Sequence, residues 1–305
     1  MIELENLSKG LWGEMILKGI STRIERGTVC GLVGSNGAGK STLLRCISGV
    51  YHPLEGEVRI AGKRIDITAS AREKIFFLAD DPYFPEGSNM QRMAKFYASY
   101  YPSFSQDTFV KLCDGLHLDP SKKISRFSKG MRMQAAVILA LATRTPYLLL
   151  DESFDGLDPV VRQAIRQLLC SEVAERKLTV IISSHSLREL QDLCDQLLFL
   201  HQGKLLLDRK TTELNSELLK VQTAFDTEYD RSIFDGLDIV RYEKLGKVAS
   251  LIIRGSKEQI KKELSKKKPV LLDIMSLTLE EIFTCEAEAL GYSFELTELT
   301  EDIKK

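Results

Sequence analysis

The feature that most constrains this chain is a glycine-rich loop at residues 34–42, which reads Gly-Ser-Asn-Gly-Ala-Gly-Lys-Ser-Thr. The apolar run Val29–Val33 precedes the loop as a predicted strand, and a helix is expected to begin near Lys40. Glycines allow the tight turn and leave space that a Cβ atom would otherwise fill. Backbone N–H groups and the positive end of the helix then attract a polyphosphate. The pattern therefore predicts a strand–loop–helix unit that binds a nucleoside triphosphate.

The same pattern predicts a role for individual loop residues. Lys40 is expected to reach the β- and γ-phosphates. Ser41 is expected to offer its hydroxyl to Mg²⁺, a hard cation that prefers oxygen ligands. The other residues expected to contact the nucleotide are Ser35, Asn36, Gly37, Ala38, Gly39 and Thr42.

A second predicted strand, residues 147–150, ends in two consecutive carboxylates, Asp151 and Glu152. Beside a phosphate-binding loop, the two carboxylates can take two different roles in ATP hydrolysis. Asp151 can hold Mg²⁺ directly or through a water molecule, and Glu152 can take a proton from the water that attacks the γ-phosphate. We therefore expect an ATPase rather than a protein that only binds the nucleotide.

Length and composition place the chain among two-domain globular proteins. It has 305 residues, 44% of them hydrophobic and 28% charged. The formal net charge of −1 gives no overall basic field, so no nucleic-acid partner is expected. No apolar stretch approaches the roughly 20 residues of a membrane span, and no signal peptide is recognised. The six cysteines include no Cys-x-x-Cys pair, which argues against a zinc or iron–sulfur site.

The predicted elements indicate an α/β core with a mainly parallel sheet, preceded by short alternating segments typical of an antiparallel β part. Residues from about 82 to 145 have helical periodicity and aromatic side chains, and they are expected to form a helical insertion. This first domain spans 1–208, and residues 213–305 are expected to form a small α+β C-terminal accessory domain. Its expected strands are 219–225, 249–253 and 270–274, and its expected helices are 257–264 and 279–290. Five lysines near its centre form either a solvated helix face or a phospholipid-facing patch; they are residues 261, 262, 266, 267 and 268.

Residues 1–208 resemble the ATP-binding cassette (ABC) family, because several of its motifs occur in the family's order. The loop at 34–42 matches the Walker A motif, and the strand at 147–150 with its two carboxylates matches Walker B. Phe-Ser-Lys-Gly-Met at 127–131 is similar to the family signature Leu-Ser-Gly-Gly-Gln. Ser128 and Gly130 match the signature, whereas Lys129 and Met131 depart from it. Asp158 in Gly-Leu-Asp resembles the D-loop aspartate, and His185 in Ser-Ser-His resembles the switch histidine.

The resemblance implies that ATP and Mg²⁺ bind between two cassettes paired head to tail. Ser128 and the amide of Gly130 would contact the γ-phosphate that the other subunit holds. His185 would contact the γ-phosphate in its own subunit and help to place the attacking water, and Asp158 would couple the two sites. The second cassette would be either an identical chain or a related one.

Two positions differ from the family pattern. Asp80 stands where the family has a glutamine that touches Mg²⁺ and water. Asp80 is therefore a candidate metal ligand, with a side chain that is shorter than glutamine and carries a charge. The aromatic residue that stacks on adenine is replaced by Leu11 at its usual place, and Trp12 follows directly. Stacking favours Trp12, whereas strict alignment favours Leu11.

The signature variant, the short helical insertion and the appendage are similar to a bacterial exporter-type group with a separately encoded permease. The expected function is therefore an ATPase subunit that powers export of a peptide, antibiotic, lipid or polysaccharide. It would lie in the cytoplasm, peripheral on the inner face of the cell membrane. Aromatic residues near 80–105 are expected to supply part of the groove for the permease, although many of them would be core. The alternative is a soluble ABC ATPase acting on ribosomes or DNA.

Overall fold

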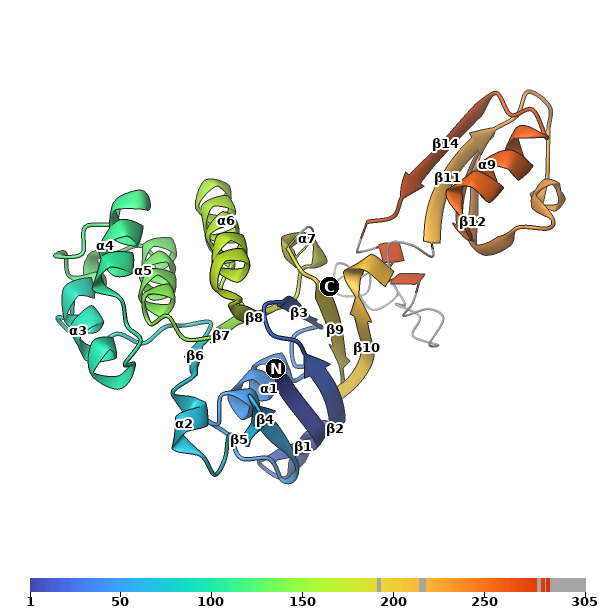
Figure 1. The fold of residues 1–305 in the computed structure, drawn as a ribbon. Helices are drawn as coiled ribbons and strands as arrows, with labels where there is room; N and C mark the ends of the chain where they lie inside the picture. Colours follow the sequence, from blue (N-terminus) through green and yellow to red (C-terminus); the bar gives the residue numbers. More distant parts are fainter. Residues whose placement is uncertain (191–192, 214–217, 279–280, 283, 286–305) are drawn as a thin grey trace, which may run out of the picture. The chain divides into compact units, whose positions relative to one another are not determined.

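The computed structural model describes residues 1–190, 193–213, 218–278, 281–282 and 284–285. The chain divides into two compact units, Met1–Arg209 and Lys210–Lys305. Figure 1 shows the ribbon, in which the first unit runs from blue to yellow and the second is orange to red.

A six-stranded sheet forms the centre of the first unit, in the order β10-β9-β3-β8-β7-β6, and its strands from β9 to β6 are parallel. Every residue of β3, β7 and β8 is buried, which explains why these strands read as nearly continuous apolar runs. The six strands are β3 (Val29–Val33), β6 (Ile75–Leu78), β7 (Tyr147–Asp151), β8 (Thr179–Ser184), β9 (Gln196–His201) and β10 (Lys204–Lys210).

A second, antiparallel sheet has the order β2-β1-β4-β5. Its strands are β1 (Ile2–Leu11), β2 (Glu14–Ile24), β4 (Glu55–Ile60) and β5 (Lys63–Arg64). Helix α1 (Lys40–Ile47) contributes Leu43 and Leu44 to a core that also contains Ile20 of β2 and Leu149 of β7. The helix behind the phosphate loop is thus held by apolar contacts with both sheets.

The helical insertion consists of α3 (Met90–Tyr100), α4 (Gln106–Gly115), a short 3-10 turn η1 (Ile124–Arg126) and α5 (Lys129–Ala142). Each of the three α-helices has a side-chain cap, because Asn89, Ser105 and Ser128 accept a hydrogen bond from the backbone N–H three residues later. The helices share a separate apolar core that includes Phe109 and Ile138. The predicted α/β cassette with an antiparallel part and a helical insertion is therefore confirmed.

The carboxyl ends of the parallel strands bring the sequence motifs to one edge of the central sheet. The phosphate loop follows β3, Asp80 follows β6, Glu152 follows β7 and His185 follows β8. This edge is where open α/β sheets bind ligands. The remaining helices of this unit are α2 (Ala69–Arg72), α6 (Pro159–Arg176) and α7 (Leu187–Leu190).

The second unit contains a four-stranded antiparallel sheet in the order β12-β13-β11-β14, packed against one helix. Its elements are β11 (Leu218–Ala224), the 3-10 turn η2 (Arg231–Phe234), β12 (Asp238–Leu245), β13 (Val248–Arg254), α9 (Lys257–Ser265) and β14 (Leu271–Ser276). Ile260 and Leu264 of α9 are buried, whereas Lys261 and Lys262 are exposed. Most of the helix expected at 279–290 lies outside the described residues.

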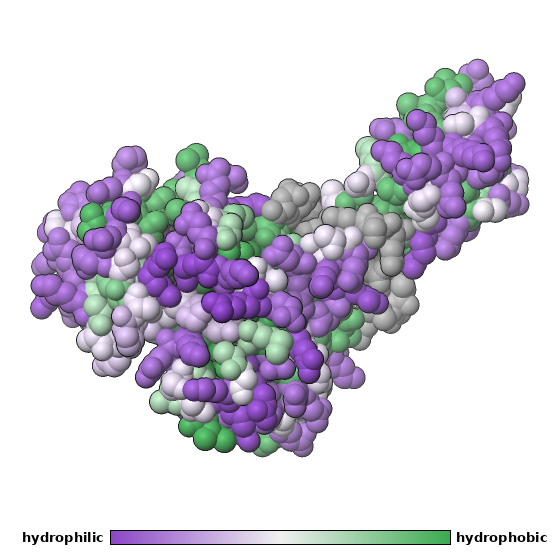
Figure 2. Space-filling view, viewed as in Figure 1, coloured by the Kyte–Doolittle hydropathy of each residue, from purple (hydrophilic) through white to green (hydrophobic). Residues whose placement is uncertain are grey.

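The face of the molecule in Figure 2 is mostly hydrophilic, with apolar side chains in small separate groups. All six cysteines are free, and five of them are buried. In the part of the chain that the structure describes, no helix has both the length and the apolar character needed to cross a membrane.

Candidate active site

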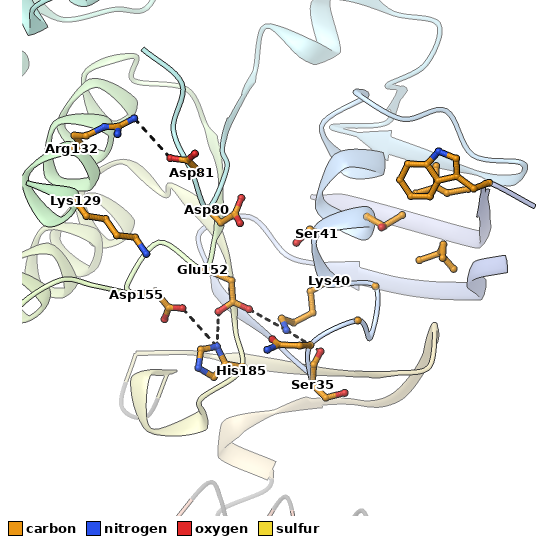
Figure 3. Close-up of a pocket in the computed structure, with 17 residues that line it drawn as sticks. Ser35, Lys40, Ser41, Asp80, Asp81, Lys129, Arg132, Glu152, Asp155 and His185 are labelled. Carbon is orange, nitrogen blue, oxygen red and sulfur yellow. Dashed lines mark hydrogen bonds and ion pairs between the residues drawn. The ribbon is translucent and has the colours of Figure 1, made fainter. Parts of the chain in front are cut away.

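A pocket of about 890 Å³ lies at the carboxyl edge of the central sheet and collects most of the predicted site residues (Figure 3). The predicted residues that line it are Trp12, Ser35, Asn36, Gly37, Gly39, Lys40, Ser41, Thr42, Asp80, Glu152 and His185. Ala38 does not line the pocket: its side chain is buried, and its carbonyl accepts a hydrogen bond from the backbone N–H of Gly203 at 3.1 Å.

The phosphate loop needs glycine at three positions for different reasons. A Cβ on Gly34 would lie 2.3 Å from the carbonyl oxygen of Leu200, which is a clash with backbone. Gly37 and Gly39 have φ values of +79° and +105°, a region that disfavours other residues. Gly39 directly precedes α1, so the unpaired N–H groups of the first helical turn face the loop. This arrangement suits a phosphate group.

Lys40 is held inside the loop although its side chain is only 5% exposed. Its Nζ atom donates to the carbonyl oxygens of Gly34 at 2.7 Å and Ser35 at 3.2 Å. The same atom lies 3.1 Å from Oε1 of Glu152. A buried ammonium with these partners has its charge compensated within the pocket.

Asp151 is fully buried at the end of β7. Its Oδ1 atom accepts a 2.6 Å hydrogen bond from the Ser183 hydroxyl, whereas Oδ2 is buried without a hydrogen-bond partner among the described residues. Burial raises the pKa of Asp151, while the hydrogen bond from Ser183 and the nearby Ser41 hydroxyl oppose this rise. An unpartnered carboxylate oxygen beside a serine hydroxyl is the donor chemistry that Mg²⁺ prefers. Asp151 and Ser41 therefore fit a magnesium site.

Glu152 has a positive φ of 45°, which is uncommon for a residue with a side chain. Its backbone N–H donates to the Ser183 hydroxyl at 2.9 Å, and this bond fixes the turn after β7. The carboxylate lies between His185 and Lys40, because Oε2 is 2.9 Å from Nδ1 of His185 while Oε1 faces Lys40 (Figure 3). Glu152 is thus positioned over the loop that would hold the phosphates.

His185 is half exposed, and its hydrogen bond with Glu152 raises the pKa of the imidazole. Asp155 adds to this rise, since its Oδ2 atom lies 3.9 Å from Nδ1 of His185. Glu152, Asp155 and His185 place one ligand atom each within 4.8 Å of one another, so they form a second set of side chains able to hold a metal ion. Sequence reasoning missed Asp155, although its place three residues after Glu152 was visible.

Leu11, Trp12 and Asp80, whose roles the sequence leaves open, all lie on the walls of the pocket. Leu11 and Trp12 both line it, and Trp12 is 94% exposed, so its ring is free to stack on a base. Asp80 is exposed and lines the pocket opposite the phosphate loop. Lys129 and Arg132, from the first turn of α5, also line it and were not predicted as site residues.

Arg132 links α5 to the segment that follows β6. Its Nη2 atom donates to the carbonyl oxygen of Pro82 at 3.4 Å and lies 3.9 Å from Oδ1 of Asp81. The signature region and the segment carrying Asp80 are therefore joined within one chain.

Comparison with known proteins agrees with this geometry. The family model described as ABC transporter matches residues 17–155. The ABC transporter ATP-binding protein YtrB of Bacillus subtilis is 31% identical over 283 residues, covering 93% of this chain and 97% of YtrB. This chain belongs to the ABC transporter ATP-binding proteins. It is thus an ATP-binding subunit of an ABC transporter and an ABC ATPase.

Several other ABC proteins match a smaller share of this chain. The lantibiotic transport ATP-binding protein SrtF of Streptococcus pyogenes is 28% identical and covers 74% of this chain and 99% of SrtF. The solved structure of an ATP-binding subunit of an ABC transporter has a TM-score of 0.65 and 26% identity, covering 70% of this chain and 92% of that one. A dimeric, post-hydrolysis cassette bound to ADP and Pi has a TM-score of 0.62 and 24% identity, covering 69% and 98%. The match with YtrB reaches into the C-terminal unit, and so does that with the uncharacterized ABC transporter ATP-binding protein YhcH of Bacillus subtilis, which is 27% identical and covers all of this chain.

The predicted residues of the signature and the D-loop lie outside the pocket. Ser128 caps α5, where its hydroxyl accepts from the N–H of Met131 at 3.2 Å. Asp158 caps α6 and accepts from the N–H groups of Val160 and Val161, both at 3.0 Å. A Cβ on Gly130 would lie 3.1 Å from the carbonyl oxygen of Gly156, so the signature packs closely on the D-loop. The structure does not bring these three residues to the phosphate loop of their own chain.

Proposed function

We propose that this ABC ATPase hydrolyses ATP to power export of a peptide, antibiotic, lipid or polysaccharide through a separately encoded membrane permease. The observation that carries the hydrolysis step is the position of Glu152, which is held by Ser183 and faces both Lys40 and His185. A general base must lie within reach of the attacking water, and this turn puts a carboxylate beside the phosphate loop.

In the proposed mechanism the phosphate loop binds the triphosphate through its backbone N–H groups, the N-terminus of α1 and Lys40. Ser41 and Asp151 would hold Mg²⁺, with Asp80 as a further candidate on the opposite wall. Bound Mg²⁺ would supply neutralising charge to the phosphate oxygens. Glu152 then takes a proton from water, and His185 donates a hydrogen bond to the γ-phosphate. The ring of Trp12 would stack on adenine.

We infer that the site is completed by the signature of a second cassette, either a copy of this chain or a related one. Ser128 and Gly130 lie at the start of α5, whose N-terminus is suited to an anion. Neither residue lines the pocket of its own chain, which supports a role toward the partner's γ-phosphate. The dimeric form of the similar ADP-bound cassette supports this arrangement. Asp158 would couple the two sites.

The proposed contact with the permease lies on the helical insertion. Tyr83, Phe96 and Tyr100 are 82%, 51% and 63% exposed, and the rings of Phe96 and Tyr100 lie 4.9 Å apart. Other aromatic residues of this region, such as Phe84, Tyr97 and Phe104, pack against the helical core. Exposed aromatic groups are typical of partner surfaces. The subunit would then lie peripherally on the cytoplasmic face of the membrane.

A peptide antibiotic as the transported substrate is supported by the name of SrtF, a lantibiotic transport ATP-binding protein. The test is affinity purification of the tagged chain from solubilised membranes of its native cell. We expect a polytopic membrane protein to co-purify, and the Y100A/F96A variant to lose it while still hydrolysing ATP. Co-purification with ribosomes in its place would contradict the transporter assignment.

A further inference from the structure

The start of α5 carries two cations and no acid. Lys129 is the first residue of this helix, Arg132 follows one turn later, and the first turn contains no acidic residue. The N-terminal end of a helix has a partial positive charge, so cations there lower its stability and acids raise it. Arg132 is held by Asp81 and by the carbonyl oxygen of Pro82. The stability of α5 does not explain Lys129, and no such partner holds it among the described residues.

The side chain of Lys129 lies against Gly156 and reaches the pocket of its own chain. A Cβ on Gly156 would lie 3.6 Å from Cδ and 3.9 Å from Nζ of Lys129, so the glycine leaves room for the lysine stem. Figure 3 shows this side chain extending from α5 toward Asp155. Lys129 lines the pocket together with the phosphate loop. A residue of the signature is thus presented to the nucleotide site of the same chain.

Most other ionisable side chains on the pocket walls already have a partner of opposite charge within 4 Å. The pairs are Glu152 with Lys40 and with His185, Asp155 with His185, and Asp81 with Arg132. Lys129 and Asp80 also line the pocket, and neither forms an ion pair within the part of the chain that the structure describes. An unpaired carboxylate suits Mg²⁺, and an unpaired ammonium suits a phosphate oxygen. Lys129 is therefore the lysine of this pocket whose charge is available to an anion.

We propose that the ammonium group of Lys129 binds the γ-phosphate of the ATP held by its own chain. This inference rests on the proposed binding of the triphosphate by the phosphate loop. The side chain extends toward the turn that carries the proposed base Glu152, and hydrolysis occurs at the γ-phosphate end of the triphosphate. Lys129 would donate charge-assisted hydrogen bonds to the terminal phosphate oxygens, in addition to those from Lys40.

The proposal gives the signature a contact with each of two nucleotides. Ser128 and Gly130 are proposed to face the γ-phosphate bound by a second cassette, whereas the side chain of Lys129 faces the nucleotide of its own chain. The first contact requires a dimer and the second does not. An effect of Lys129 on the monomer therefore separates its role from that of the two neighbouring residues.

The test is calorimetric titration of the monomeric chain with a non-hydrolysable ATP analogue and with ADP, each with Mg²⁺. Gel filtration at the same protein concentration verifies that no dimer is present. Lys129→Met removes the charge at nearly constant length, and Lys129→Arg keeps the charge. Lys111→Met, at an exposed position of α4, is the matched control. We expect K129M to bind the triphosphate analogue about three- to fivefold more weakly, as for a partly exposed charge pair, and ADP within about 1.5-fold of the parent. K129R and K111M should resemble the parent.

Two binding results would overturn the proposal. One is equal affinity of K129M and the parent for the triphosphate analogue, and the other is an equal loss of affinity for the analogue and for ADP, because the lysine would then not act on the γ-phosphate. K129M should also unfold at a temperature no lower than the parent, since it removes a cation from a helix N-terminus. A lower unfolding temperature would indicate a structural role and count against the proposal.

A Lys40→Ala variant in the same titrations tests the proposed nucleotide site itself. If K40A binds the triphosphate analogue as tightly as the parent, the phosphate loop is not the binding site and the proposed function fails. If K40A binds it more weakly while K129M does not, the proposed site stands and only the role of Lys129 is contradicted. The two failures are therefore distinguishable.

Discussion

The Nζ atom of Lys40 lies 3.1 Å from Oε1 of Glu152, so the lysine of the phosphate loop and the candidate base neutralise each other. For hydrolysis the two groups must act on different partners, since Lys40 has to face phosphate oxygens and Glu152 a water molecule. Binding of the triphosphate would draw Lys40 toward the new negative charge and release Glu152. The ion pair thus links occupancy of the loop to activation of the base.

This relationship predicts opposite effects of the two single variants on ATP binding. Lys40→Ala removes a charged donor, and such hydrogen bonds contribute roughly 1.5–3 kcal/mol, so ATP affinity should fall roughly 10- to 150-fold. Glu152→Gln frees Lys40 from its anionic partner, so ATP should bind at least as tightly as to the parent. Equilibrium binding of a fluorescent ATP analogue measures both, with Lys63→Ala as the control. Weaker binding by E152Q would show that the ion pair does not compete with phosphate.

The loop glycines should differ in the kind of damage that alanine causes. Gly34→Ala drives a Cβ to 2.3 Å from the Leu200 carbonyl oxygen, so backbone must move and both stability and ATP binding should fall. Gly37→Ala meets no atom within 4 Å and bears only the cost of its φ of +79°, about 1–2 kcal/mol. Thermal unfolding with and without ATP compares the pair. Equal losses of stability would contradict this distinction.

Ser183 should support the metal site although it is not a predicted ligand. Its hydroxyl donates to Oδ1 of Asp151 and accepts from the N–H of Glu152, so Ser183→Ala leaves both groups without this partner. We expect a loss of about 1–3 kcal/mol in the free energy of unfolding and a several-fold higher Mg²⁺ concentration for half-maximal turnover. Ser171→Ala, at an exposed position, is the control. An unchanged Mg²⁺ requirement would show that Ser183 does not support the metal site.

Trp12 offers a direct reading of adenine binding, because it is the only tryptophan in the chain and is 94% exposed. If its ring stacks on the base, ATP should change its fluorescence, and Trp12→Ala should weaken ATP binding about fivefold or more. Leu11→Ala should have a smaller effect. A larger loss with L11A, together with unchanged Trp12 fluorescence, would assign the base contact to Leu11.

The sequence alone predicted which motif residues would meet at one edge of the central sheet. The phosphate loop, the Asp151–Glu152 pair and His185 each follow a buried strand, so parallel strand order alone brings them to one edge. Asp155 was missed because its approach to His185 depends on a turn that begins with a positive φ at Glu152. Arg132 was missed because its contacts with Asp81 and Pro82 join segments about 50 residues apart. Such contacts depend on tertiary packing rather than on the spacing of residues along the sequence.

In the C-terminal unit, one element of secondary structure was likewise not predicted from the sequence. Strands β11, β13 and β14 lie close to the predicted segments, whereas β12 (Asp238–Leu245) was not predicted. Its charged residues Arg241, Glu243 and Lys244 are exposed and interrupt the apolar alternation. An edge strand pairs with only one neighbouring strand, so its sequence shows a weaker apolar alternation from which to predict it.

The most direct test of the composite ATPase site is the molar mass of the Glu152→Gln variant with ATP and Mg²⁺, measured by light scattering after gel filtration. We predict a stable dimer that is absent without ATP, and a monomer under both conditions for the double variant E152Q/S128R. Each variant should release γ-phosphate at least about 100-fold more slowly than the parent. An E152Q variant that stays monomeric with ATP bound, or that hydrolyses ATP as fast as the parent, would contradict the account.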